Sequence, residues 1–160
     1  MLNPQLVWVD AWALEDQLGE AAEAFSNAGE ARRSLTHGMA EGVLRLYHWH
    51  FLDGESDLSW AVAMRDKLRS KFLRVLYLIG DQYEAGGRWE EAAELYQRGL
   101  ELDNLAEELY RRLILTYQKR GQLAGALKVY RRCRQMLSVV LGVQPSASTE
   151  ALYQSLKALE

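Results

Sequence analysis

The densest group of side chains that could do chemistry lies near residue 50. Its two histidines and three carboxylates fall within ten positions, at His48, His50, Asp53, Glu55 and Asp57. Imidazole and carboxylate groups are the ligands of many divalent metal sites. Their spacing matches no metal-ligand motif, and histidines two positions apart share a helix face poorly. We therefore interpret this segment as a polar loop and predict no metal ligand in the chain.

Other patterns that would indicate catalysis are missing from the sequence. It contains no glycine-rich phosphate loop, no HExxH metalloprotease motif and no GxSxG nucleophile elbow. Cys133 is the single cysteine and lies on an apolar helix face, which indicates packing rather than reactivity. A single cysteine cannot form an internal disulfide, and it fits a reducing cytoplasm. We predict a cytoplasmic protein that is not an enzyme, with no catalytic residues and no cofactor.

Apolar residues at three- and four-residue spacing indicate helices along the whole chain. No apolar run is long enough to span a membrane, and the N-terminus has neither the basic nor the apolar region of a signal peptide. We predict an all-α fold, a tetratricopeptide-like solenoid of about seven helices in one domain over residues 1–160. The predicted helices cover residues 10–25, 36–48, 58–85, 89–102, 105–119 and 122–141, and a last one capped by Ser146 or Ser148 with Leu152, Leu156 and Leu159 on one face.

Two segments, residues 73–102 and 107–136, repeat each other with an offset of 34 residues and no gap. This period is typical of the tetratricopeptide repeat, in which each unit is a pair of antiparallel helices. A glycine permits positive φ in the turn between paired helices, and an alanine lets the helices cross closely. The residues that match across the repeat are Tyr83 with Tyr117, Gly87 with Gly121, Ala92 with Ala126 and Tyr96 with Tyr130.

The first helix of each unit lines the concave groove of a tetratricopeptide array. A mixed polar and aromatic lining can hold a peptide through side-chain hydrogen bonds. Because an array of two units needs capping elements, the N-terminal helices of the chain could equally cover this face. The candidate groove residues are Arg74, Tyr77, Asp81 and Glu84 from one unit, and Glu108, Arg111, Leu115 and Gln118 from the next.

The net charge of −3 conceals a strong polarity along the chain. Residues 1–108 hold 20 acidic and 10 basic side chains, whereas residues 109–149 hold eight basic ones and no acid. Such a basic block is typical of a nucleic-acid footprint. The alternative is that it faces the acidic helix over residues 90–101 and neutralises it.

The two interpretations differ in how the basic side chains are arranged on their helix. Adjacent helical residues point about 100° apart, so Arg131, Arg132 and Arg134 cannot all face one partner. We therefore predict that part of the block pairs with acids of this chain and that part stays in solvent. A strip for nucleic acid would need Arg120, Lys128, Arg131 and Arg134 to be exposed together and unpaired.

Three segments are more specific than the repeat. They are VWVDAWALE near the start, LRLYHWHFLDGESDLSWAVAMRDKL in the middle, and the stretch from LDNLAEELYRR through LSVVLGVQPSASTEALYQSL at the end. Together they resemble the bacterial transcriptional activator domain, the tetratricopeptide-like module of antibiotic-regulatory-protein (SARP) type activators. The resemblance extends from Val7 to about Leu159. Asn104 stands where the family usually has proline, and Gly99 where it commonly has alanine.

The resemblance implies a role in transcription control. In that family the module lies next to a winged-helix DNA-binding domain, and this sequence begins directly at the module. We therefore expect a fragment of a longer regulator that contacts DNA only through a separate domain. Its expected partners are a protein or a second copy of itself, through dimerisation, partner contact or intramolecular signalling, and no membrane. The alternative is a free-standing tetratricopeptide adaptor that binds a peptide in its concave groove.

Overall fold

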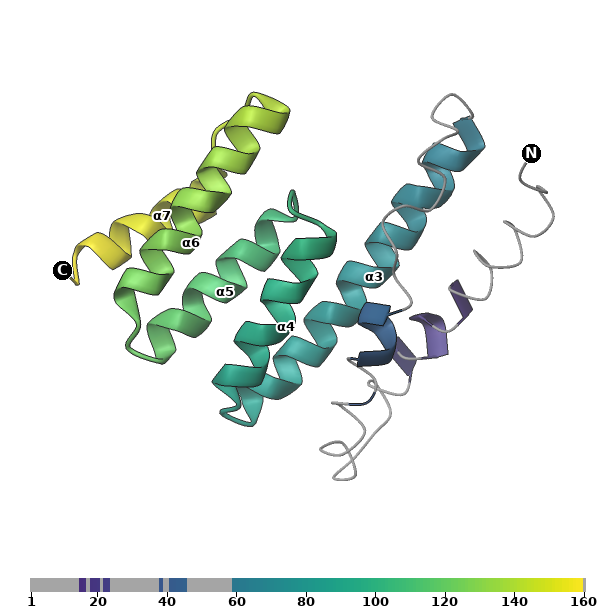
Figure 1. Cartoon of the computed structure of the whole chain (residues 1–160), viewed down its shortest axis with the longest axis horizontal. Coiled ribbons are helices and arrows are strands. Elements are labelled where there is room, and N and C mark those ends of the chain that lie inside the picture. Colours follow the sequence, from purple (N-terminus) through teal and green to yellow (C-terminus); the bar gives the residue numbers. More distant parts are fainter. Residues whose placement is uncertain are drawn as a thin grey trace. The chain divides into compact units, whose positions relative to one another are not determined.

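The computed structural model describes residues 15–16, 18–20, 22–23, 38, 41–45 and 59–159. The chain divides into two compact units, Met1–Gln82 and Tyr83–Glu160, each of which is described by itself. All of the regular structure in the described residues is helical, as predicted (Figure 1). The described parts of the two N-terminal helices predicted over 10–25 and 36–48 are helical too.

Helix α3, Ser59–Ala85, contributes the long apolar stripe predicted for this segment. Its buried face includes Leu68, Phe72, Val75 and Ile79, at most 2% exposed. Leu18, from the helical residues near position 20, is equally buried in the first unit. Glu15 pairs with Lys67 at 2.7 Å and with Lys71 at 2.5 Å, both on α3. Hydrogen bonds from Lys67 and Lys71 lower the pKa of Glu15.

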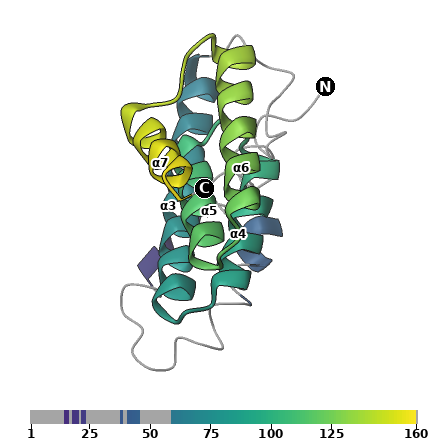
Figure 2. The same cartoon turned by 90° about the vertical axis from the view of Figure 1, so that its left-hand side faces the viewer.

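The second unit is a right-to-left succession of helices in Figure 1 that ends with α7. Helices α4 (Trp89–Leu102), α5 (Glu107–Lys119) and α6 (Leu123–Met136) pack in chain order, α5 against both of the others. A π-helical segment, η1 (Leu137–Leu141), continues α6, and α7 (Ala147–Lys157) packs on α6 and α5 (Figure 2). This arrangement confirms the predicted helical hairpins.

The glycine turns confirm the 34-residue repeat at the level of single hydrogen bonds. Gly87 and Gly121 have φ of 68° and 69°. After α3, the Gly87 and Arg88 amides donate to the carbonyls of Glu84 and Tyr83. After α5, the Gly121 and Gln122 amides donate to those of Gln118 and Tyr117, at 3.0 and 2.9 Å. Both pairs form the Schellman motif, which satisfies carbonyls at a helix end by means of a left-handed residue.

Replacing Gly121 with valine is therefore expected to lower the free energy of unfolding by about 1 kcal/mol or more, because a β-branched residue resists positive φ. The matched control is Gly121→Asn, since asparagine tolerates the left-handed region best among residues with a Cβ. Urea denaturation followed by circular dichroism compares the two. Equal midpoints would show that the conformation at this turn does not limit stability.

The core of the second unit contains the repeat residues. Tyr83, Tyr96 and Tyr110 are among the largest fully buried side chains, and Ala92 and Ala126 are 0% exposed. The cluster between α5, α6 and α7 is formed by Ile114, Ala126, Leu127, Tyr130 and Leu156. The rings of Tyr130 and Tyr153 stack with centroids 4.0 Å apart and thereby hold α7 on α6. Both repeat alanines and three of the four repeat tyrosines are thus buried, and the fourth, Tyr117, is half-buried.

Replacing Ala126 with leucine is expected to overpack this cluster and to lower the free energy of unfolding by about 1–3 kcal/mol. The control is Ala124→Leu, which adds the same atoms at an exposed position of α6. Thermal and urea unfolding of the two variants provide the comparison. If both variants unfold like the unmodified chain, Ala126 does not lie at a close helix contact.

The predictions at helix ends were partly wrong. Helix α5 begins at Glu107 rather than at residue 105, because the Leu105 amide donates to the Asp103 carboxylate at 3.2 Å and is held in a turn. The helix predicted over 122–141 ends at Leu141 as predicted, before Gly142 with φ of 68°, but its last turn from Leu137 is π-helical, which was not predicted. Leu159 was predicted on the inner face of the last helix, but α7 ends at Lys157 and Leu159 is 61% exposed.

Among the helices that the structure describes, none combines the length and apolar character that crossing a membrane requires.

Candidate functional site

The predicted groove residues of α3 are divided between the two units. Arg74 and Asp81 are exposed and Tyr77 is half-buried in the first unit. Glu84 belongs to the second unit, where it accepts a hydrogen bond from the Tyr96 hydroxyl at 2.5 Å. Burial raises the pKa of Tyr96, and the bond to Glu84 raises it further. Glu84 therefore anchors a buried tyrosine of α4.

The predicted groove residues of α5 lie on two different parts of its surface. Leu115 is 44% exposed, and Gln118 is half-buried one turn further along. Glu108 pairs with Arg111 and, at 3.2 Å, with the Nε atom of Arg112. Arg111 also reaches the start of α7, with its Nη1 atom 3.2 Å from the Ser146 hydroxyl. The end of α5 near Leu115 is thus open, whereas its beginning is engaged with α7.

A carboxylate that the sequence analysis did not select organises this contact. One oxygen of Glu107, Oε1, accepts hydrogen bonds from the Ser146 amide at 2.8 Å, the Ser146 hydroxyl at 2.7 Å and the Thr149 hydroxyl at 2.5 Å. Arg111 lies 3.8 Å from the same oxygen. Ser146 is the N-cap of α7, as predicted, but its hydroxyl bonds to Glu107 rather than to a backbone amide of its own helix. We call Glu107, Arg111, Ser146 and Thr149 the α5–α7 clamp.

The electrostatics of the clamp favour the ionised form of Glu107. Burial alone would raise its pKa, but the hydrogen bonds from Thr149 and Ser146 outweigh that effect, and the pKa is lowered. A carboxylate at a helix N-terminus also interacts favourably with the helix dipole. The clamp is therefore a structural joint between two helices. The N-cap prediction was the one signal of it in the sequence, because Glu107 and Ser146 are 39 positions apart.

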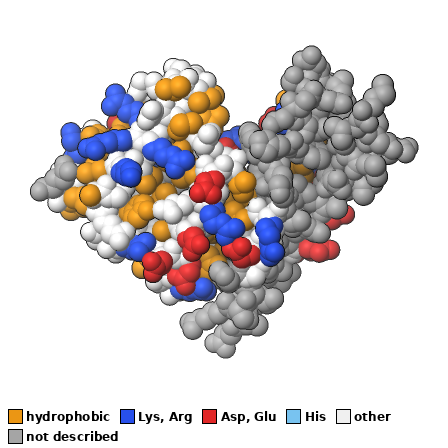
Figure 3. All heavy atoms as spheres, in the orientation of Figure 1, with side chains coloured by type: hydrophobic (Ala, Val, Ile, Leu, Met, Phe, Trp, Pro, Cys, Tyr) orange, Lys and Arg blue, Asp and Glu red, His pale blue; other side chains and the backbone are white. Residues whose placement is uncertain are grey.

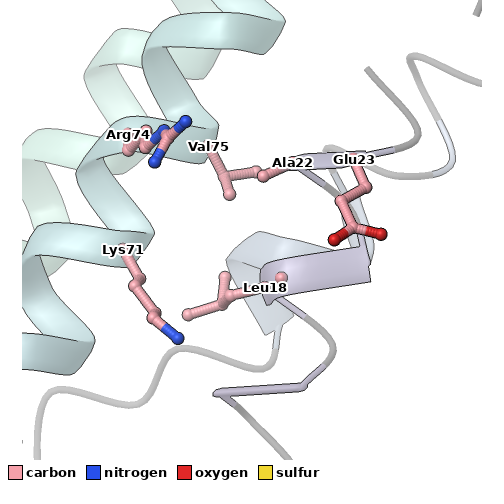
Figure 4. Close-up of a pocket in the computed structure, with 7 residues that line it drawn as sticks. Leu18, Ala22, Glu23, Lys71, Arg74 and Val75 are labelled. Atoms are coloured by element: carbon pink, nitrogen blue, oxygen red, sulfur yellow. The ribbon is translucent and has the colours of Figure 1, made fainter. Parts of the chain in front are cut away.

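A cavity of about 630 Å³ lies in the first unit (Figure 4). Its volume is in the range of small-molecule pockets. Arg74, the one candidate groove residue that lines it, projects from α3, and Glu23 faces the cavity from the opposite side. The apolar part of the lining is provided by Leu18, Ala22 and Val75, and Lys71 adds a second cation that is already paired with Glu15. These groups can hold a ligand by charge and apolar contact.

The basic block divides as predicted into a paired and a solvated part. Arg111 and Arg112 pair with acids of their own helix, and Arg120 pairs with Glu90 of α4 at 3.4 Å. Arg132 donates a hydrogen bond to Tyr110. The exposed cations Lys128, Arg131 and Arg134 have no ion pair within the described residues. Because Arg120 is paired, the four-residue strip expected for nucleic acid is not present.

The metal and cysteine predictions can be followed only in part. His48, His50, Asp53, Glu55 and Asp57 lie outside the described residues. Within the ranges that are described, no three metal-ligating side chains come together. Cys133 is 0% exposed, as predicted, and burial raises the pKa of its thiol to about 12. A thiol that stays protonated and buried is unreactive.

Comparison with known families identifies almost the whole chain. The bacterial transcriptional activator domain matches residues 9–157, which include both repeat units, the α5–α7 clamp and the LGVQP turn. Comparison with curated proteins found no match, and comparison with solved structures found none. The all-α helical hairpins and the glycine turns agree with the tetratricopeptide-like fold that the sequence predicted. The chain belongs to the bacterial transcriptional activator domain family, and it is a regulatory domain of the type found in transcriptional activators.

Proposed function

We propose that this chain is a protein-contact domain through which a cytoplasmic bacterial activator communicates with a partner protein, with a second copy or with its own neighbouring domain. The observation that carries the proposal is the family match over residues 9–157. A separate domain would read the DNA. The domain acts without catalysis and without a cofactor. It works by presenting surface side chains to the protein or domain that it contacts.

The construction of the second unit supports this proposal. Its helices are joined by a buried tyrosine and aliphatic core and by the α5–α7 clamp, so it presents fixed side chains to solvent. Charged residues within the hairpins are largely paired with one another, as in Glu108 with Arg112 and Glu90 with Arg120. A rigid helical scaffold with exposed side chains suits recognition of a protein surface.

A tethering experiment tests the proposal. The 160-residue chain is fused to a heterologous DNA-binding domain with a known operator, and transcription from a reporter behind that operator is measured in bacteria. Reporter output above that of the DNA-binding domain alone is the expected result. A fusion that is folded and bound to the operator but has no effect would contradict the proposal. Tyr96→Ala, which removes a buried core side chain, is the inactive control.

A second experiment tests the proposal that a separate domain, and not this one, recognises the DNA sequence. The chain is mixed with a pool of randomised duplexes, and bound DNA is selected through several rounds. We expect no enriched sequence. The basic strip would need Arg120 beside the exposed cations Lys128, Arg131 and Arg134, and Arg120 is paired with Glu90. Enrichment of one sequence that is lost in Lys128→Glu/Arg131→Glu would place DNA recognition in this domain.

The second candidate function is that of an adaptor that binds a peptide through the candidate groove residues. The exposed side chain of Leu115 on α5 favours it, because aliphatic side chains serve as anchors for peptides. A selection from a displayed peptide library against the chain is the test. Peptides whose binding is lost in Leu115→Ala and in Gln118→Ala, but kept in the exposed-site control Lys119→Ala, would establish the adaptor.

A further inference from the structure

The end of the α6–η1 helix exposes an unusual group of aliphatic side chains. Val139 is 77% exposed, Val140 51%, Leu141 53% and Val143 48%. Scattered apolar residues on a surface are normal, but neighbouring ones form a patch that indicates an interaction site. We call these four residues the η1 tip.

The η1 tip is a formed surface and not an unravelled helix end. The Val143 amide donates to the Leu137 carbonyl at 3.3 Å, and the Gly142 amide donates to that of Ser138 at 3.1 Å. Gly142 closes the helix in the left-handed conformation, and Leu137 anchors its start in the core at 3% exposure. π-helical segments within longer helices occur frequently at functional sites. The backbone therefore holds the aliphatic side chains in solvent.

Cations precede the η1 tip on the same helix. Lys128, Arg131 and Arg134 are exposed, at successive three-residue steps of α6, and the described residues provide no acid to pair with any of them. Figure 3 shows Lys and Arg side chains and a hydrophobic group on the same face of the second unit. At 1.5 Å per residue, Lys128 and Val139 are separated by about 16 Å along the helix axis. Charge and apolar surface thus follow one another along about three turns.

We propose that this face, the cations of α6 followed by the η1 tip, binds an acidic amphipathic helix of a partner protein. Carboxylates of the partner would meet Lys128, Arg131 and Arg134, and its aliphatic side chains would cover Val139 and Val140. The charge of the face selects the charge of the partner, and its length matches a helix of about three turns. This inference rests on the proposed function and specifies the chemistry of the partner.

Other occupants fit the face less well. A two-fold contact with a second copy places the same patch against itself, and that patch offers no acidic side chain to the cations. Nucleic acid would neutralise the cations but would leave the aliphatic tip in water, since backbone phosphates do not pack on it. Of these three occupants, only an acidic amphipathic helix satisfies both halves of the face.

The test uses a designed probe and the complete 160-residue chain. The probe is a fluorescein-labelled helical peptide of about four turns, with glutamates at its N-terminal half and leucines at i, i+3 and i+4 spacing toward its C-terminus. A permuted peptide of the same composition lacks the helical stripe. Fluorescence anisotropy in buffer with physiological salt should show binding of the probe at least about tenfold tighter than of the permuted peptide.

Variants of the chain assign the binding to each half of the face. Val139→Ser/Val140→Ser and Lys128→Glu/Arg131→Glu should each weaken binding of the probe by about tenfold or more. Leu159→Ser and Lys119→Glu alter an equally exposed aliphatic residue and an equally exposed cation elsewhere, and they should leave binding unchanged. A probe with lysine in place of glutamate should bind the charge-reversed variant better than the unmodified chain. All substituted positions are exposed, and circular dichroism checks the fold of each variant.

Several results would overturn the inference. Equal binding of the probe and the permuted peptide would do so, as would loss of binding in the two control variants. Three competing occupants are tested beside the probe. They are vesicles of phosphatidylglycerol and phosphatidylcholine, a duplex DNA, and a second copy of the chain, whose self-association is measured by light scattering. Binding of any of these that is abolished by the same substitutions, without binding of the acidic probe, would assign the face to that occupant. If tethered activation persists in the η1 tip variants, the proposed function stands and this inference falls.

Discussion

Replacing Ile114 with alanine is expected to lower the free energy of unfolding of the second unit by about 2–5 kcal/mol, the range measured for such truncations in protein cores. Ile114 is 0% exposed and belongs to the cluster that joins α5 to α6 and α7. Truncation removes three carbon atoms and leaves a cavity that helices held on both sides cannot easily fill. Urea denaturation measured by circular dichroism and by tryptophan fluorescence provides the midpoint.

The chain offers a matched control at the next position. Leu115→Ala removes the same number of carbon atoms from the same helix, but Leu115 is 44% exposed. Its effect should stay below about 1 kcal/mol because most of the removed surface was already in water. Equal losses in the two variants would mean that α5 does not present Ile114 to the core and Leu115 to solvent.

Removal of the clamp carboxylate has the second-largest expected effect. Glu107→Ala should lower the free energy of unfolding by about 2–3 kcal/mol, because the fully buried hydroxyl of Thr149 loses its acceptor and Arg111 keeps only Glu108 as a carboxylate partner among the described residues. The loss should be concentrated in α7, and hydrogen exchange should accelerate first in its amides. The control is Glu108→Ala, which removes a carboxylate from half-exposed ion pairs at the adjacent position and should cost less than about 1 kcal/mol.

The pH dependence of stability gives an independent check on the clamp. The pKa of Glu107 in the folded chain is lowered from its usual value of 4.5. The stability that its ionised form contributes is therefore fully present above that value and is lost as the pH falls through the lowered pKa. From about pH 5 down to about pH 3, the unmodified chain should lose more stability than Glu107→Ala does. If both chains lose the same free energy of unfolding, the hydrogen bonds from Ser146 and Thr149 do not stabilise the ionised form of Glu107.

Much of the fold could be predicted because its determinants are local. The apolar spacing of α3, the glycine turns at Gly87 and Gly121, and the N-cap at Ser146 each depend on residues only a few positions apart. The 34-residue offset adds a second copy of each signal, and the Schellman hydrogen bonds after Gly87 and Gly121 repeat it. These local sequence patterns predicted the ends of the helices less accurately. Asp103 delays the start of α5 through a side-chain bond, and the wide turn of η1 has no separate sequence pattern.

The sequence by itself determined the helices, their order, the glycine turns and the family of the chain. Only the tertiary structure decided which charged and apolar side chains stay in solvent. Arg111 was placed in a groove by helical spacing, but α7 folds back and engages it, a contact between residues 35 positions apart. Val139 and Val140 were read as the end of an amphipathic helix, yet no described helix covers them. The reason is that periodicity defines the faces of one helix, whereas exposure depends on the neighbour that packs, or does not pack, against each face.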